Sequence, residues 1–160
     1  MTLNRPPTKL QKLLAVFDAF HTSLEALPGD YSKALIFNWK QTRSFYTNIP
    51  EGVRPSKLAS GLEEALLEML MLFEAAPSEQ RTAINKAFYQ TLAKYHPEFL
   101  SKQQGRFEKI LAKGRISRES EYYVIRHYVD IYEDNQEHCD LLNRLYQLID
   151  LYESLHSKAV

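Results

Sequence analysis

The sequence predicts an all-α fold: a single domain over residues 1–160, built as one compact bundle of six or seven helices with short connections. Apolar residues recur every three or four positions along most of the chain, which is the spacing of one helix face. No Asn-Gly or Asp-Gly pair occurs, and no run alternates apolar with polar residues, so hairpins and half-buried strands are not indicated. A chain of 160 residues, 44% of them hydrophobic, can bury a core without disulfides or metals.

The first two helices are separated by a short turn. Residues 1–7 are expected to form a flexible tail, and apolar spacing predicts a long amphipathic helix over 8–27. Pro28 and Gly29 end it, and a second helix follows at once with a core face that runs to Phe45. Such a short join favours an antiparallel helix pair.

The third helix is predicted to be the hub of the bundle. Pro55 opens it, and between Leu58 and Phe73 its second half is apolar at every position but Glu68. A narrow polar stripe in the first half leads, at 100° per residue, to Leu72 with Met71 at its edge. We expect another helix to cover this end of the hub. The alternative is an exposed apolar patch at Met71 and Leu72 that forms a secondary interface with a partner or a second copy.

Four further helices are predicted after the hub, with polar or helix-breaking residues between them. Ser78 is expected to cap a helix that buries Tyr95, and Ser117 to cap the sixth helix. Gly114 has the place of a terminating glycine between the fifth and sixth helices. Residues 133–137 form a polar break. The predicted spans are 78–95, 99–113, 118–132 and 138–155.

Charge is sorted along the chain although the formal net charge is zero. Residues 101–118 carry six Lys or Arg and one acid, whereas residues 119–160 carry nine acids and three Lys or Arg. Four of the cations are spaced by four, three and four, which places them on one side of a helix, and two more follow Gly114. We call these six the basic stripe: Lys102, Arg106, Lys109, Lys113, Arg115 and Arg118.

The basic stripe has three interpretations. It could grip phosphates or an acidic protein, since long cationic side chains on a rigid helix reach oxygen acceptors. It could be only a solvated face. It could also dock on the acidic segment 130–140 of the same chain or of a second copy.

No catalytic residue, cofactor site or metal site is predicted. The acids around His138 and Cys139 lack the spacing of a known zinc motif, and Glu153 with His156 is a single Glu-x-x-His without a counterpart. His127 is expected to be structural. Glycine-rich phosphate loops, Gly-x-Ser-x-Gly elbows and His-Glu-x-x-His helices are absent, which disfavours an enzyme.

Tyrosine is abundant, with ten in the chain. Its ring buries well while its hydroxyl keeps a hydrogen bond, which suits interfaces and the margins of a core. We expect Tyr122, Tyr132 and Tyr152 at core margins. Tyr123 points away from them and is the interface candidate.

The sequence therefore favours a protein-binding module: an adaptor, an antitoxin or an immunity-type protein that uses the basic stripe and Tyr123 to hold an acidic partner. The alternative is nucleic-acid binding through the same stripe, with the Gly114 turn joining two helices in a helix-turn-helix-like arrangement. The single cysteine and the absence of a secretory signal lead us to expect a cytoplasmic protein without a membrane partner. Whether it forms a homo-oligomer is left open.

Overall fold

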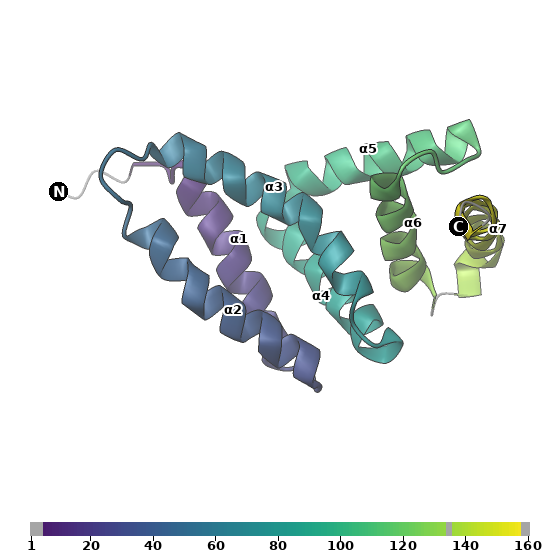
Figure 1. The fold of residues 1–160 in the computed structure, drawn as a ribbon, viewed down its shortest axis with the longest axis horizontal. Coiled ribbons are helices and arrows are strands. Elements are labelled where there is room, and N and C mark those ends of the chain that lie inside the picture. The colour runs from purple at the N-terminus through teal and green to yellow at the C-terminus, as the bar shows by residue number, and fades with distance from the viewer. Residues whose placement is uncertain (1–4, 134–135, 158–160) are drawn as a thin grey trace.

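A computed structural model describes residues 5–133 and 136–157 and confirms the all-helical prediction (Figure 1). Within these residues seven α-helices and one short 3₁₀ turn form, and no strand does. The predicted tail lies partly outside the described residues, as does part of the polar break at 133–137. The elements are α1 (Lys9–Leu24), α2 (Asp30–Thr47), α3 (Pro55–Glu74), α4 (Ser78–Tyr95), α5 (Pro97–Lys113), α6 (Glu119–Tyr132), η1 (Gln136–His138) and α7 (Cys139–Ser157).

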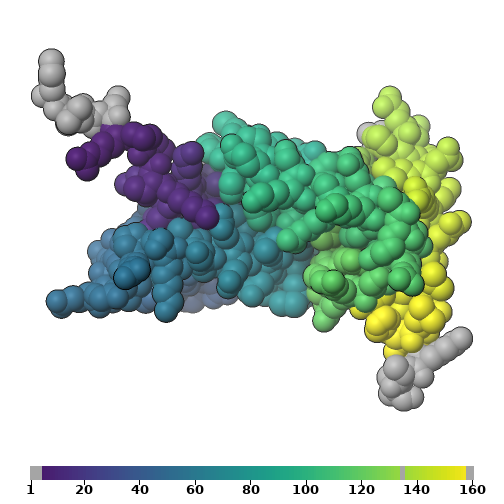
Figure 2. All heavy atoms as spheres, turned by 90° about the horizontal axis from the view of Figure 1, so that it is seen from above, coloured from purple at the N-terminus to yellow at the C-terminus, as the bar shows by residue number. Residues whose placement is uncertain are grey.

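Helices that are not neighbours in the sequence make much of the packing. α1 lies against α2, α3 and α4, and α6 lies against α3, α4, α5 and α7 (Figure 1). Figure 2 shows α7 across one end of an elongated molecule. Among the described residues, no helix is long and apolar enough to cross a membrane.

Rings from three helices meet at the centre of the core. Phe20 of α1, Phe73 of α3 and Phe88 of α4 lie with ring centroids 5.2–5.6 Å apart. Toward α7, Phe107 stacks on Tyr128 at 4.0 Å. These contacts join both halves of the molecule into one core, because α4 and α6 also pack on each other.

The predicted glycine at the end of α5 is confirmed by the structure, and two predicted serine caps are wrong. Thr8 and Gln11 form a reciprocal capping box at the start of α1, and Gly114 ends α5 at a φ of 76°, as predicted. Ser78 is not a cap, because Pro77 occupies the extended position before α4. Ser117 is not a cap either, because Arg118 occupies that position in α6.

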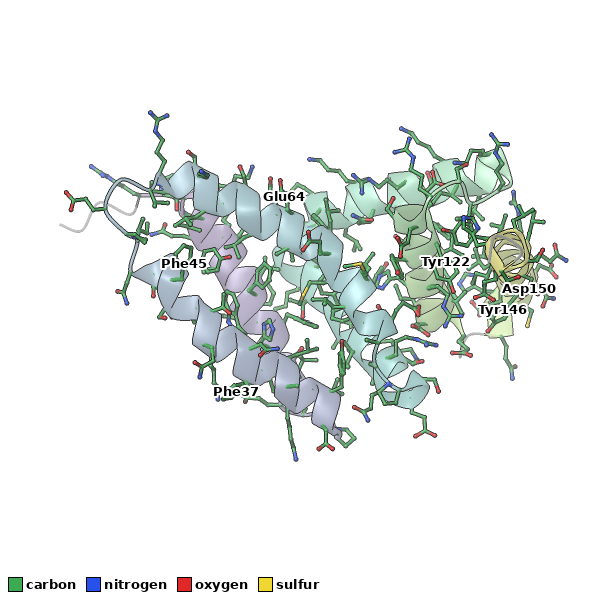
Figure 3. All side chains as sticks on the ribbon, in the orientation of Figure 1. Phe37, Phe45, Glu64, Tyr122, Tyr146 and Asp150 are labelled. Carbon is green, nitrogen blue, oxygen red and sulfur yellow. The ribbon has the colours of Figure 1, made fainter. Side chains whose placement is uncertain are left out.

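Two predicted core aromatics are exposed. Phe45 is 50% exposed and Tyr95 is 48% exposed. α2 packs mainly on α1 and buries only Ser32 and Trp39, and Phe45 near its end contacts Tyr46 beside an open hollow (Figure 3). Tyr95 ends α4 beside a hollow lined by the polar first turns of α1.

The hub helix α3 is covered on one side only. Its buried face packs on α1, α4 and α6, but Leu67, Met71 and Leu72 are 39%, 46% and 45% exposed. The expectation that a helix covers Leu72 is therefore wrong. α2 diverges from α3 apart from a hydrogen bond from the Tyr31 hydroxyl to the Leu72 carbonyl. Met71 and Leu72 are both exposed, as the alternative expected, but they line separate hollows on two sides of α3 and do not form one patch.

Candidate functional site

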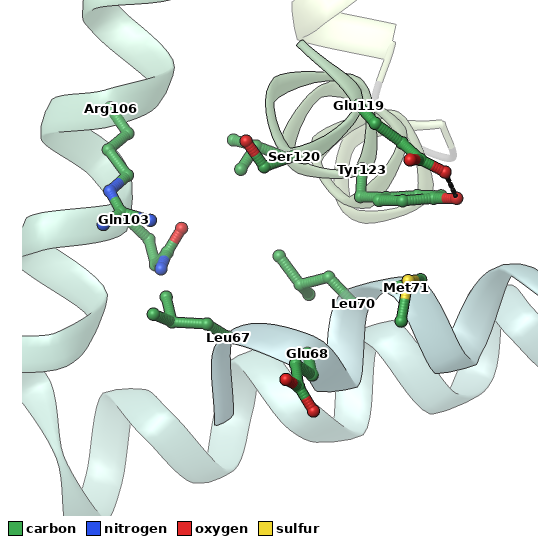
Figure 4. A pocket seen from close by; sticks show the side chains of 10 residues that line it. Leu67, Glu68, Leu70, Met71, Gln103, Arg106, Glu119, Ser120 and Tyr123 are labelled. Carbon is green, nitrogen blue, oxygen red and sulfur yellow. Dashed lines mark hydrogen bonds between the residues drawn. The ribbon is translucent and has the colours of Figure 1, made fainter. Parts of the chain in front are cut away.

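Two adjoining hollows lie between α3, α5 and α6. The first, which we call the apolar pocket, has a volume of about 310 Å³ (Figure 4). The second, the basic groove, has a volume of about 520 Å³. They share Arg106, Ser120 and Val124, so they form one continuous surface. The apolar pocket is lined by Leu67, Glu68, Leu70, Met71, Gln103, Arg106, Glu119, Ser120, Tyr123 and Val124. The basic groove is lined by Arg106, Lys109, Ile110, Lys113, Arg118, Ser120, Glu121 and Val124.

The turn at Gly114 brings the two sides of the basic groove together. Its left-handed backbone ends α5, and residues 115–118 return the chain so that α6 packs along α5. The stack of Phe107 on Tyr128 holds the two helices in contact below the groove. The cations of α5 consequently face the first turns of α6.

Most of the predicted partner-binding residues converge on this surface. Arg106, Lys109, Lys113 and Arg118 line the basic groove, and Tyr123 lines the apolar pocket. Met71 also lines the apolar pocket, so one residue of the predicted secondary interface belongs to the same site.

Three predicted residues lie elsewhere. Lys102 is exposed near the start of α5, and Arg115 is exposed in the turn after it; neither lines the site. Leu72 lies on the other side of α3, beside Trp39 in a separate hollow of about 170 Å³ that α1, α2 and α3 share. The sequence pattern cannot separate these from the others, because helical spacing does not show where a neighbouring helix lies.

The cations of the groove differ in what they contact. Lys113 donates to both carboxylate oxygens of Glu121 at 2.8 and 2.9 Å, and Glu121 also accepts from the Ser117 N–H at 2.7 Å. Partial burial works against the charged form of Glu121, but these bonds hold its pKa below the ordinary value. Lys113 is thus occupied within the fold.

Arg106, Lys109 and Arg118 make no ion pair with any described residue. All three are exposed, and none of them forms an ion pair with the described residues of the acidic segment, 130–133 and 136–140. The interpretation in which that segment neutralises the stripe within one chain therefore has no support in the part of the chain that the structure describes.

The opposite edge of the apolar pocket is acidic. Glu68 lies on α3, and Glu119 accepts a hydrogen bond from the Tyr123 hydroxyl at 2.7 Å (Figure 4). This hydrogen bond, with some burial, raises the pKa of Tyr123 to about 12. The site is therefore cationic on the α5 side and anionic on the other, which orients a charged partner.

Gln103 is the polar residue of the pocket that sequence reasoning missed. Its side chain is only 5% exposed, and its Oε1 atom has no hydrogen-bond partner among the described residues. Figure 4 shows its amide pointing into the space between α3 and α6. Its position in the sequence could have identified it, because Gln103 falls at helical spacing on the buried face of α5, which also carries Phe99, Phe107 and Ile110. A glutamine at a core position is expected to have a partner.

A buried polar network joins α4 to α6 elsewhere in the molecule. Asp130 accepts from Arg81 Nε at 3.1 Å, from Asn85 Nδ2 at 2.7 Å and from Thr82 Oγ1 at 3.3 Å. His127 Nδ1 donates to Asn85 Oδ1 at 2.6 Å. The network is inaccessible, with Asp130 1% exposed and His127 5% exposed. Its role is to hold the two helices together.

The buried network changes the description of the acidic segment 130–140, because its first residue is not part of an exposed acidic surface. Asp130 belongs to α6 and is buried, whereas Glu133, Glu137 and Asp140 are exposed and Asp134 lies outside the described residues. Among the described residues, no group of three His, Cys, Asp or Glu side chains could hold a metal ion.

The three predicted core-margin tyrosines are half-buried, as expected. Tyr122 stacks on Tyr152 at 5.0 Å and donates to Glu153 at 2.6 Å, and Tyr132 stacks on Tyr128 at 6.0 Å. These contacts fix α7 against α6. The Tyr122 ring also lies 5.6 Å from the ring of Tyr123, which lines the apolar pocket.

No protein family, curated protein or solved structure matches the chain. The site's own geometry is therefore the basis for any statement about function.

Proposed function

We propose that the protein is a protein-binding module, of an adaptor, antitoxin or immunity type, that holds an acidic partner on the surface between α3, α5 and α6. The observation that carries this is the combination of three exposed cations that make no ion pair with any described residue, Arg106, Lys109 and Arg118, with an apolar pocket directly beside them. An apolar centre with a charged rim is the usual anatomy of a protein interface.

The arrangement supports a protein partner more than a nucleic acid. Glu68, Glu119 and Glu121 line the same surface as the cations. A phosphate backbone carries regularly spaced negative charge and would be repelled by them. A folded or extended protein segment can place its acids on the α5 side alone.

We also propose a cytoplasmic location. The exposed free thiol of Cys139 supports it, because a reducing compartment keeps such a thiol reduced.

Reversing the two central cations tests the proposal. We expect Arg106→Glu combined with Lys109→Glu to weaken binding of a labelled acidic peptide by about tenfold or more, because two attractive contacts of several tenths of a kcal/mol each become repulsive. Fluorescence anisotropy over a salt titration measures this. Lys113 is left unchanged, since its replacement would also break the bond to Glu121.

Lys33→Glu combined with Lys40→Glu is the matched control, because both lysines are exposed on α2 and the change in net charge is the same. Equal losses in the two double variants would show bulk electrostatics and would contradict a site between α5 and α6. A duplex DNA of equal charge that binds more tightly than the peptide, with affinity falling steeply as salt rises, would favour the nucleic-acid alternative.

A further inference from the structure

We infer that the apolar pocket receives one tryptophan or tyrosine side chain from an acidic segment of the partner, with Gln103 Oε1 accepting the hydrogen bond of the indole N–H or the phenol O–H. This inference rests on the proposed function and names the chemistry that the partner inserts. It follows from three properties of the pocket: its walls, its unpartnered acceptor and its charge.

The walls of the pocket favour an aromatic ring. Leu67, Leu70, Met71 and Val124 are its apolar lining residues, and Leu67 and Met71 are 39% and 46% exposed. A volume of about 310 Å³ is at the lower end of the 300–1,000 Å³ that ligand pockets span, which fits one large side chain better than a cofactor. The Met71 thioether is a favourable neighbour for a ring.

The unpartnered Gln103 Oε1 atom determines which large side chain of the partner fits the pocket best. Gln103 is 95% buried, and its Oε1 atom has neither contact with solvent nor a donor in the described part of the chain, so an inserted side chain bonds to it once the Gln103 amide turns toward the open pocket. A phenylalanine, leucine or methionine in the pocket would leave that atom unpaired. Indole N–H and phenol O–H groups end a large apolar body with a donor, which is what this combination requires.

The charges around the pocket determine where the partner segment can carry acidic residues beside its aromatic residue. Arg106 lines both hollows, and Lys109 continues along the basic groove. Carboxylates that follow the aromatic residue along this groove would meet unpaired cations. Carboxylates on the other side would meet Glu68 and Glu119. The partner segment thus has its acids on one side of the aromatic anchor.

The experiment compares two acidic peptides that differ only at a central residue, tryptophan or phenylalanine. Titration calorimetry with the full chain should give about fivefold tighter binding of the tryptophan peptide, the value of one net hydrogen bond. In Gln103→Leu the difference should vanish. That variant should also melt about 2–4 °C higher, since it removes an unpaired buried acceptor.

Gln147→Leu on α7 is the control, because Gln147 is exposed and outside both hollows. It should keep the preference for tryptophan. The comparison of the two peptides on the unaltered protein stays decisive even if Gln103→Leu fails to fold.

Three outcomes would overturn the inference. Equal binding of the two peptides would leave an acidic partner without an aromatic anchor, so the proposed function would survive alone. Binding of neither peptide at millimolar concentration would contradict both the inference and the proposed function, since an acidic segment would then have no affinity for this surface. A dimer of the protein by itself that Gln103→Leu dissociates would make a second copy the occupant.

Discussion

Asp130→Ala is expected to lower the free energy of unfolding by about 3 kcal/mol, the cost of removing one partner of a buried ion pair. Asp130 is 1% exposed and accepts three hydrogen bonds, from Arg81, Thr82 and Asn85. Without it, the Arg81 guanidinium and the Asn85 amide lose their main acceptor in the interior. The cost falls at the lower end of the usual range because Glu74 stays 3.8 Å from Arg81.

Urea unfolding followed by far-ultraviolet circular dichroism measures this loss. The control is Glu63→Ala, which breaks an exposed pair with Lys9 at 2.9 Å and should cost less than about 1 kcal/mol. Similar losses in the two variants would show that the network between α4 and α6 does not stabilise the fold as a buried pair does.

Mild acid is expected to destabilise the protein through His127. Burial lowers the pKa of His127 to about 3, whereas an unfolded histidine titrates near 6.5. Between these values the unfolded state binds the extra proton, so the free energy of unfolding falls by up to about 1.4 kcal/mol for each pH unit of acidification below 6.5.

Other groups contribute to the acid response, and Glu121, whose pKa is lowered, adds to the loss of stability below its ordinary value of 4.5. His21, whose pKa is also lowered by burial, works in the same direction. Burial raises the pKa of Asp130 despite the opposing effect of Arg81, so Asp130 opposes the fall only in the more acidic part of the range, above the ordinary value of 3.8.

His127→Asn isolates the effect of His127, because its side-chain amide still donates to Asn85 while nothing titrates. Urea unfolding at pH 6.5, 5.5 and 4.5 should show a flatter dependence than in the unaltered protein, by about 1 kcal/mol per pH unit. His156→Asn is the control, since His156 is exposed on α7. An unchanged slope in His127→Asn would mean that His127 is protonated in the folded state.

Local patterns predicted the helices well. The spacing of apolar residues, the glycine at 114 and the prolines at 28, 55 and 97 act within a few residues of their position in the sequence, and the structure places helix ends beside them. The failures at Phe45, Tyr95 and Leu72 share one cause. Whether an apolar helix face is buried depends on which other helix lies over it, and periodicity contains no information about that.

The same limit explains why only part of the site could be predicted from the sequence. The cations on α5 could be found because they are neighbours on one helix. Gln103, Ser120 and Val124 become part of the site only because α6 returns along α5 and packs on α3. The partnership of Asp130 with Arg81 spans 49 residues and could not be seen in the acidic composition around residue 130.

The most direct test of the proposed binding surface is a photo-crosslinking residue placed at position 120, in the centre of the two hollows, in the full chain expressed in its native host. The account predicts a crosslink to a protein segment rich in Asp and Glu, lost when Arg106 and Lys109 are reversed and kept when Lys33 and Lys40 are reversed. A crosslink to nucleic acid, or the same product from a crosslinker at exposed position 147 on α7, would contradict it.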